Sequence, residues 1–194
     1  LFVRVVTPAF AASSMSQYRV GDDADSDTLA YVHRADDPEF WVLAANLAFA
    51  DDQDLLLSTL IHEYGHILSL GVADADPDAA ACNTLELSEG CLAPGSLLLA
   101  FDERFWLPYG PEAPTPDDDD ADAAAAFYAA HEEDFVSDYA ATNVVEDFAE
   151  SFMTFVLEDR PESSSAVAEK ILFFWDVPEY VDIRDRIRTE FALG

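Results

Sequence analysis

Residues 62–66 read HEYGH, a spacing of two histidines and a glutamate that suits metal chemistry. Because an α-helix has about 3.6 residues per turn, His62 and His66 project from one face and can reach the same ion. Imidazole is a common zinc ligand, and Glu63 directly follows His62, where it can hold a water at the metal and take its proton. The chain has only 4 histidines. We therefore predict a zinc centre here rather than two unrelated histidines on a helix.

The residues around this motif predict the helix that must position it. Apolar residues recur at helical spacing and form a broad buried side, namely Leu56, Leu57, Leu60, Ile61, Tyr64, Ile67 and Leu68. Asp51 or Asp52 suits the N-cap, and Asp54 suits the first turn. Gly71 suits the C-terminal stop. We predict a helix over about residues 52–70.

A catalytic zinc site needs a third protein ligand and an open position for water. His33 and His131 have no ligand-like context, and no further histidine follows HEYGH at the spacing of the metzincin class. A carboxylate on a later helix is therefore expected. Glu146 is the candidate, because Asn143 and Glu146 have the spacing of a capping box at the start of a helix predicted over 143–158.

Two further residues near Glu146 suit such a site. Glu150 lies four residues after Glu146 on the same side of the helix, where it could hydrogen-bond a ligating histidine. Tyr139 precedes Glu146 by seven residues, and its phenol could stabilise an oxyanion formed during peptide hydrolysis. The apolar stripe of this helix comprises Val145, Phe148, Ala149, Phe152 and Val156. The alternative is that these acids only solvate a helix in a very acidic protein.

The two segments together, HEYGH at 62–66 and YAATNVVEDFAESF at 139–152, resemble the gluzincin metallopeptidases related to the catalytic domain of anthrax lethal factor. The resemblance implies a zincin-like fold and one Zn²⁺ per chain. It implies zinc ligation by His62, His66 and Glu146, general base catalysis by Glu63, transition-state assistance by Tyr139, and Glu150 as an acidic neighbour of the ligands. It covers a small part of the chain, so the substrate class of lethal factor is not transferred.

Outside these segments, the sequence predicts a mainly helical α+β domain with a small N-terminal sheet. Strands are expected over 28–34 and 40–49, and the apolar start LFVRVV is interpreted as another strand. Further helices are expected over 96–106, 117–134, 163–175 and 179–192, the second with its Asp117–Asp120 run at the positive N-terminal end. The length of 194 residues suits one domain over 1–194.

The remaining segments are expected to be connections. Residues 21–27 are interpreted as an acidic loop, 72–95 as an irregular connection and 107–116 as a proline-rich loop. The strand before the 52–70 helix is a candidate edge for an extended substrate, which could bind by strand addition.

Acidic residues dominate the charge of the chain. Forty acidic and 9 basic residues give a net charge of −31. Nucleic acid is excluded as an expected partner because phosphate binding needs a basic surface, and anionic membrane surfaces would repel the protein. No apolar run reaches the length of a membrane span. Three interpretations of the acidity stay open: solubility, adaptation to high salt, and attraction of basic substrates.

Cys82 and Cys91 are the only cysteines, and they bound the short polar segment CNTLELSEGC. A disulfide that closes this loop is expected, with two free thiols as the alternative. A disulfide fits an extracytoplasmic or secreted protein. The chain starts at Leu1 rather than Met, so we expect upstream sequence to have been removed, and a signal peptide or lipoprotein anchor could have been lost with it.

These observations predict a zinc-dependent metallopeptidase, an endopeptidase acting on peptides or proteins. Two alternatives belong to other classes. One is a catalytically silent module that binds zinc and recognises a peptide or protein in its cleft. The other is an acidic interaction domain without a metal, for which chelators would have no effect on folding.

Overall fold

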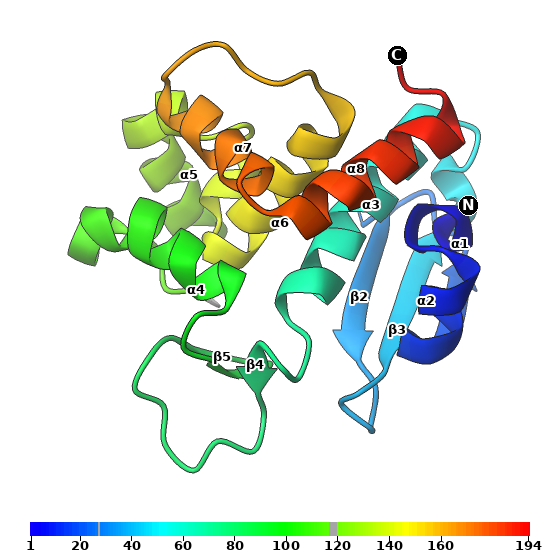
Figure 1. Ribbon diagram of the computed structural model, residues 1–194, viewed down its shortest axis with the longest axis horizontal. Coiled ribbons are helices and arrows are strands. Elements are labelled where there is room, and N and C mark those ends of the chain that lie inside the picture. The colour runs from blue at the N-terminus through cyan, green and yellow to red at the C-terminus, as the bar shows by residue number, and fades with distance from the viewer. Residues whose placement is uncertain (27, 117–119) are drawn as a thin grey trace.

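A three-stranded sheet forms the N-terminal part of the computed structural model, which describes residues 1–26, 28–116 and 120–194 (Figure 1). Its strand order is β1-β3-β2. β3 (Trp41–Asn46) pairs parallel with β1 (Met15–Gly21) and antiparallel with β2 (Ala30–Arg34). The expectation that this strand, which precedes the HEYGH helix, is an open edge is therefore wrong, because β3 is paired on both sides and the edges are β1 and β2. The two strands predicted over 28–34 and 40–49 are confirmed in shortened form, because Asn46 caps the 3₁₀ turn η1 (Leu47–Phe49) and ends β3.

The prediction of a strand at the start of the chain is wrong. Residues Phe2–Val6 form helix α1, and Pro8–Ser14 form helix α2. Phe2, Val5 and Val6 are buried, and their i, i+3, i+4 spacing is that of a helix face. Pro8 occupies the first turn of α2, where its missing N–H leaves no partner unsatisfied. The third strand of the sheet comes from residues 15–21 instead, and Asp27 of the predicted acidic loop lies outside the described residues.

Helices α3 (Gln53–Ser69) and α6 (Val144–Leu157) pack against each other in the middle of the molecule. Both confirm the sequence prediction to within two residues. Asp52 is the N-cap of α3, and Asn143 is the N-cap of α6. Leu70 is the C-cap of α3. Gly71, the predicted C-terminal stop, follows it but does not adopt a left-handed conformation.

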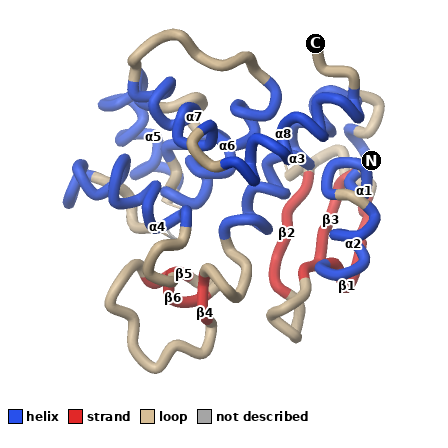
Figure 2. The backbone as a smooth tube through the Cα atoms, in the orientation of Figure 1, coloured by secondary structure: helices blue, strands red, loops and turns tan. Residues whose placement is uncertain are grey.

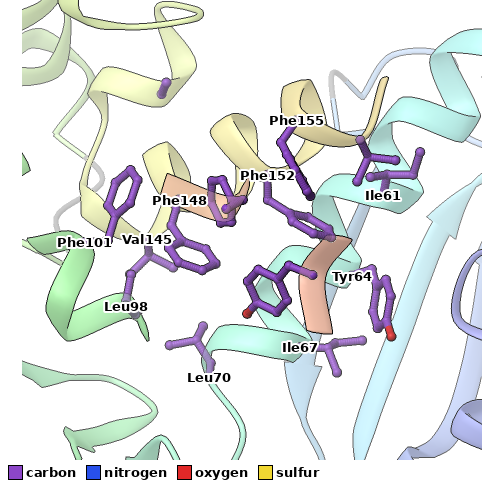
Figure 3. Close-up of a cluster of buried hydrophobic side chains, with 14 of the residues drawn as sticks. Ile61, Tyr64, Ile67, Leu70, Leu98, Phe101, Val145, Phe148, Phe152 and Phe155 are labelled. Carbon is purple, nitrogen blue, oxygen red and sulfur yellow. The ribbon is translucent and has the colours of Figure 1, made fainter. Parts of the chain in front are cut away.

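Aromatic and aliphatic side chains from these two helices form the centre of the hydrophobic core. Figure 3 shows Ile61 and Tyr64 from α3 beside Phe152 and Phe155 from α6. The rings of Tyr64 and Phe152 meet edge to face with centroids 6.3 Å apart. The sheet lies on one side of α3 and α6 lies on the other, whereas α8 runs across to contact α1 (Figures 1 and 2).

The remaining helical elements surround α6, and their bounds agree broadly with the prediction. They are α4 (Leu97–Phe101), the π-helical turn η2 (Asp102–Trp106), the 3₁₀ turns η3 (Leu107–Glu112), η4 (Glu132–Asp134) and η5 (Tyr139–Ala141), α5 (Ala121–His131), α7 (Ala166–Trp175) and α8 (Pro178–Phe191). The predicted proline-rich loop over 107–116 is therefore partly 3₁₀, interrupted at Gly110 with φ 57°. Asp120 caps α5, whereas Asp117–Asp119 lie outside the described residues.

The connection 72–95 contains a second small sheet, which the sequence analysis missed. Strand β6 (Gly90–Leu92) pairs antiparallel with β4 (Ala75–Asp76) and β5 (Glu86–Leu87). Strands of two or three residues are too short to produce an alternating pattern. Cys82 and Cys91 are joined by a disulfide within this segment, with Cα atoms 5.3 Å apart. Among the described residues, no helix combines the length and apolar character needed to cross a bilayer.

Candidate metal centre

Three side chains from two helices converge on one point. His62 and His66 of α3 bring their Nε2 atoms within 2.9 Å of each other. Glu146 of α6 places Oε2 3.1 Å from the Nε2 atom of His62 and 3.3 Å from that of His66. The three donor atoms lie within 4.8 Å of one another and could hold a metal ion. The structure thus brings together the two histidines and the carboxylate that the sequence analysis proposed as ligands.

The approach of the two helices depends on the glycine inside HEYGH. A Cβ atom on Gly65 would lie 3.2 Å from the Cα atom of Ala149 and 3.1 Å from Cδ1 of Phe152, both in α6. Both distances are tighter than ordinary van der Waals contact. Without a side chain at 65, the α6 backbone approaches the α3 backbone closely enough for Glu146 to reach both imidazoles.

The start of α6 is determined by Asn143. Its side-chain oxygen accepts hydrogen bonds from the backbone amides of Val145 and Glu146, at 2.9 and 3.0 Å. Such a cap satisfies amides that the helix itself leaves unpaired. Because Glu146 lies in the first turn of the helix, the cap also determines where the carboxylate projects.

Glu150 lies one turn after Glu146 and contacts a proposed ligand directly. Its Oε1 is 2.8 Å from Nδ1 of His62, so it orients the imidazole and leaves Nε2 toward the metal position. Its other oxygen, Oε2, accepts a 2.7 Å hydrogen bond from the hydroxyl of Ser137. Sequence reasoning did not identify Ser137, since a lone serine thirteen positions before Glu150 forms no recognisable motif.

Glu63 points toward the edge of the sheet. The backbone amide of Val32 in β2 donates a 2.9 Å hydrogen bond to Oε2 of Glu63. The side chain is buried, and this burial raises the pKa of its carboxyl above the usual value, while the nearby imidazoles oppose the shift. A buried carboxylate with a raised pKa accepts a proton more readily than an exposed one.

Tyr139 reaches the same region from the turn η5, where it is 52% exposed. Its ring centroid lies 5.8 Å from that of His62. Partial burial and the negative charges of Glu146 and Glu63 raise the pKa of the phenol well above its usual value. The hydroxyl therefore keeps its proton at neutral pH and can act as a hydrogen-bond donor.

Opposite charges in the centre shift the pKa values of its candidate ligands. Burial would lower the pKa of His62, but the carboxylates of Glu146 and Glu150 raise it to about 10. Burial would likewise raise the pKa of Glu146, but the two imidazoles hold it well below its usual value. The metal-free centre thus binds a proton between groups that could bind a cation.

A pocket of about 480 Å³ adjoins these groups. His62, Glu63 and Tyr139 line it, so side chains that could take part in a reaction face an accessible space. Leu29, Leu55 and Met153 also line it, and these residues were not singled out from the sequence.

The other two histidines lie away from this centre. His33 in β2 contacts the carbonyl of Arg34 through Nδ1 at 2.8 Å. His131 packs on the ring of Tyr109 with centroids 4.8 Å apart, and its Nε2 is 3.7 Å from a carboxylate oxygen of Glu112.

Comparisons of the chain with protein-family models, curated proteins and solved structures found no match.

Proposed function

We propose that this chain is a zinc-dependent peptidase with a zincin-like arrangement. One observation carries the proposal: His62, His66 and Glu146 converge on one point, with Glu63 and Tyr139 beside them on an accessible pocket. Two imidazoles and one carboxylate are the ligand set of a known class of catalytic zinc site, which keeps a fourth position open.

The geometry supports zinc as the ion. Tetrahedral zinc binds these donors at about 2.0–2.2 Å, which separates the donor atoms from one another by about 3.3 Å. The three separations of 2.9, 3.1 and 3.3 Å approach that value. The Oε2 atom of Glu146 is buried and faces the Nε2 atoms of both imidazoles. A buried oxygen of this kind needs a partner, and a metal ion would provide one.

Each residue around the ion would then have a defined role in peptide hydrolysis. Bound zinc supplies Lewis acidity for a water and for the scissile carbonyl. Glu63 takes the proton of the attacking water and returns it to the leaving amine. The phenol of Tyr139 donates a hydrogen bond to the carbonyl oxygen as negative charge develops there. Glu150 holds His62 in the orientation and tautomer that leave Nε2 free for the ion.

The position of β2 supports an extended peptide as substrate. β2 is an edge strand of the sheet, and Ala30 within it lines the pocket. An edge strand can hydrogen-bond the backbone of an added strand. A peptide bound beside β2 would pass in front of Glu63, which already hydrogen-bonds the amide of Val32.

We infer an oxidising, extracytoplasmic location from the Cys82–Cys91 disulfide.

The first experiment measures the zinc content of the purified protein beside that of Glu146→Ala. We expect close to one zinc per chain in the parent and much less in the variant. Absence of zinc from the parent after reconstitution would overturn the proposal, and equal zinc in both proteins would move the third ligand elsewhere.

A cleavage assay on a diverse peptide mixture then tests the reaction, with Glu63→Gln as the control. The variant should keep its zinc and lose turnover by about 10²- to 10⁴-fold, since it cannot accept the proton. Zinc binding without cleavage by the parent would favour a silent binding module instead.

A further inference from the structure

The only lysine of the chain is buried behind the candidate metal centre. Lys170 of α7 is 1% exposed and Asp147 of α6 is fully buried. Their Nζ and Oδ2 atoms are 2.7 Å apart. Asp147 directly follows the proposed ligand Glu146, so the ion pair holds the same helical turn about 100° around the helix axis from Glu146. The chain has 40 acidic residues, yet its single lysine pairs with a buried carboxylate rather than with one on the surface.

The polar groups of Asp147 are fully used. The indole Nε1 of Trp106 donates to Oδ2 at 2.7 Å, and the hydroxyl of Ser151 donates to Oδ1 at 3.2 Å. These bonds and the ion pair connect α6 to η2 and α7. These contacts therefore hold the first turn of α6 in place, and Glu146 lies in that turn.

Lys170 also holds the segment that enters the site. Its ammonium donates a 2.8 Å hydrogen bond to the carbonyl of Asp134 and lies 3.7 Å from the ring centroid of Phe135. Three residues after Asp134, Ser137 donates to Glu150. Tyr139 lies two residues beyond Ser137. One ammonium group therefore contacts both α6, which carries Glu146 and Glu150, and the segment that leads to Ser137 and Tyr139.

Stability alone does not account for such a pair. Removing two charges from water is costly, and well-packed apolar residues of similar volume often give equal or greater stability. An ion pair with directed hydrogen bonds, however, specifies one arrangement of the groups that it joins. The arrangement specified here is that of the Glu146 turn relative to the Ser137–Tyr139 segment.

We propose that Lys170 is a positioning residue of the metal centre, which it serves by joining Asp147 on α6 to the carbonyl of Asp134 ahead of Ser137 and Tyr139. The proposal rests on the proposed function insofar as the positioned groups bind zinc. Lys170 itself contacts neither the metal position nor the pocket residues named above.

The test compares three variants. Lys170→Met leaves a buried Asp147 without its cation and should lower stability strongly. The double variant Asp147→Asn/Lys170→Met removes both charges with little change in volume, but it does not restore the hydrogen bond to Asp134. The matched control is Arg184→Met. Arg184 is also buried and donates to the carbonyls of Phe155 and Glu158, at the opposite end of α6.

Zinc affinity by chelator competition and thermal unfolding are measured for each protein. We expect the double variant to recover most of the stability that Lys170→Met loses, yet to bind zinc about 10- to 100-fold more weakly than the parent, as for other supports of metal ligands. Arg184→Met should lose stability with little change in zinc affinity. Parent-like zinc affinity in the double variant would overturn the proposal, as would zinc affinity that simply follows stability across all three variants.

Hydrogen exchange on the metal-free proteins separates this proposal from the proposed function. Exchange over residues 134–141 should be faster in the double variant than in the parent and unchanged in Arg184→Met. If the parent bound no zinc, the proposed function would fall, while faster exchange in this segment would still support the positioning role. Unchanged exchange would overturn that role whatever the metal content.

Discussion

At the scale of single residues, the ionisation of His62 would couple the proposed metal binding to pH. Glu146 and Glu150 raise its pKa to about 10 against the opposing effect of burial. The imidazole is therefore protonated in the metal-free protein at neutral pH, and zinc binds only the neutral ring. In the metal-free protein, this proton stabilises the fold below the unfolded pKa of about 6.5, and the stabilisation is lost as the pH rises through about 10.

Zinc uptake should accordingly release a proton from His62. Between pH 7 and 9 we expect about one such proton per zinc, and apparent affinity that rises about tenfold per pH unit and levels off near the pKa of His62. Calorimetry in buffers of different ionisation enthalpy measures the release. Glu150→Gln removes one of the carboxylates that raise this pKa, so its plateau should begin at lower pH. Zinc affinity independent of pH over this range would contradict the assignment.

Tyr139 gives a second prediction at the residue scale. Tyr139→Phe removes a proton donor but leaves the three proposed ligands in place. We expect turnover to fall by about 10²- to 10³-fold, the typical effect of losing one oxyanion donor, with zinc content unchanged. Steady-state kinetics beside metal analysis measures both. Parental turnover in this variant would remove Tyr139 from the mechanism.

At the scale of elements, the crossing of α3 and α6 assembles the centre. Capping and helical periodicity determine where the side chains of each helix project, but only the close packing of the two helices brings Glu146 to the histidines. Gly65 permits this approach, because the α6 backbone at Ala149 occupies the space where a side chain would project. The distance between the helices therefore determines the distance between the ligands.

Gly65→Ala tests this dependence. In an isolated helix the substitution would be favourable by about 1 kcal/mol. Here the added Cβ would meet the Ala149 Cα at 3.2 Å, so we expect the helices to separate, with lower thermal stability and weaker zinc binding. Gly71→Ala is the matched control, because its Cβ would have no neighbour closer than 3.8 Å. Parental zinc affinity in Gly65→Ala would show that the crossing tolerates a side chain.

At the scale of the whole molecule, the net charge of −31 is the dominant electrostatic feature. Several of the few cations serve the interior rather than balance surface acids. Lys170 is buried, and Arg184 donates to backbone carbonyls at the C-terminal end of α6. Arg34 donates to the carbonyls of Leu70, the C-cap of α3, and of Ala75. Surface carboxylates therefore repel one another, and dissolved salt weakens that repulsion.

Salt dependence separates the three interpretations of the acidity. If the protein is adapted to high salt, its melting temperature should rise between low and molar sodium chloride, and potassium chloride should act similarly. A flat response would leave solubility as the simpler account. If the charge serves instead to attract basic substrates, cleavage of basic peptides should weaken as salt increases, whereas cleavage of neutral peptides should not.

Local interactions explain how much of the fold was predictable. The bounds of α3 and α6, their caps at Asp52 and Asn143, and the shared face of His62 and His66 follow from contacts a few residues apart. The α1 helix was misread as a strand, because six apolar-rich residues suit either state until packing selects one. The short strands between 75 and 92 gave no periodic signal for the same reason of length.

The sequence by itself therefore determined α3 and α6, the two helices that carry the candidate ligands, and identified which side chains could bind a metal. Only the tertiary structure decided that Glu146 lies about 3 Å from imidazoles some eighty residues earlier in the chain. It also decided that Ser137 supports Glu150, that the Val32 amide holds Glu63, and that Lys170 pairs with Asp147, the residue after Glu146. Capping and helical periodicity act over one or two turns, whereas these contacts join segments whose separation is closed only by burial of the shared hydrophobic core.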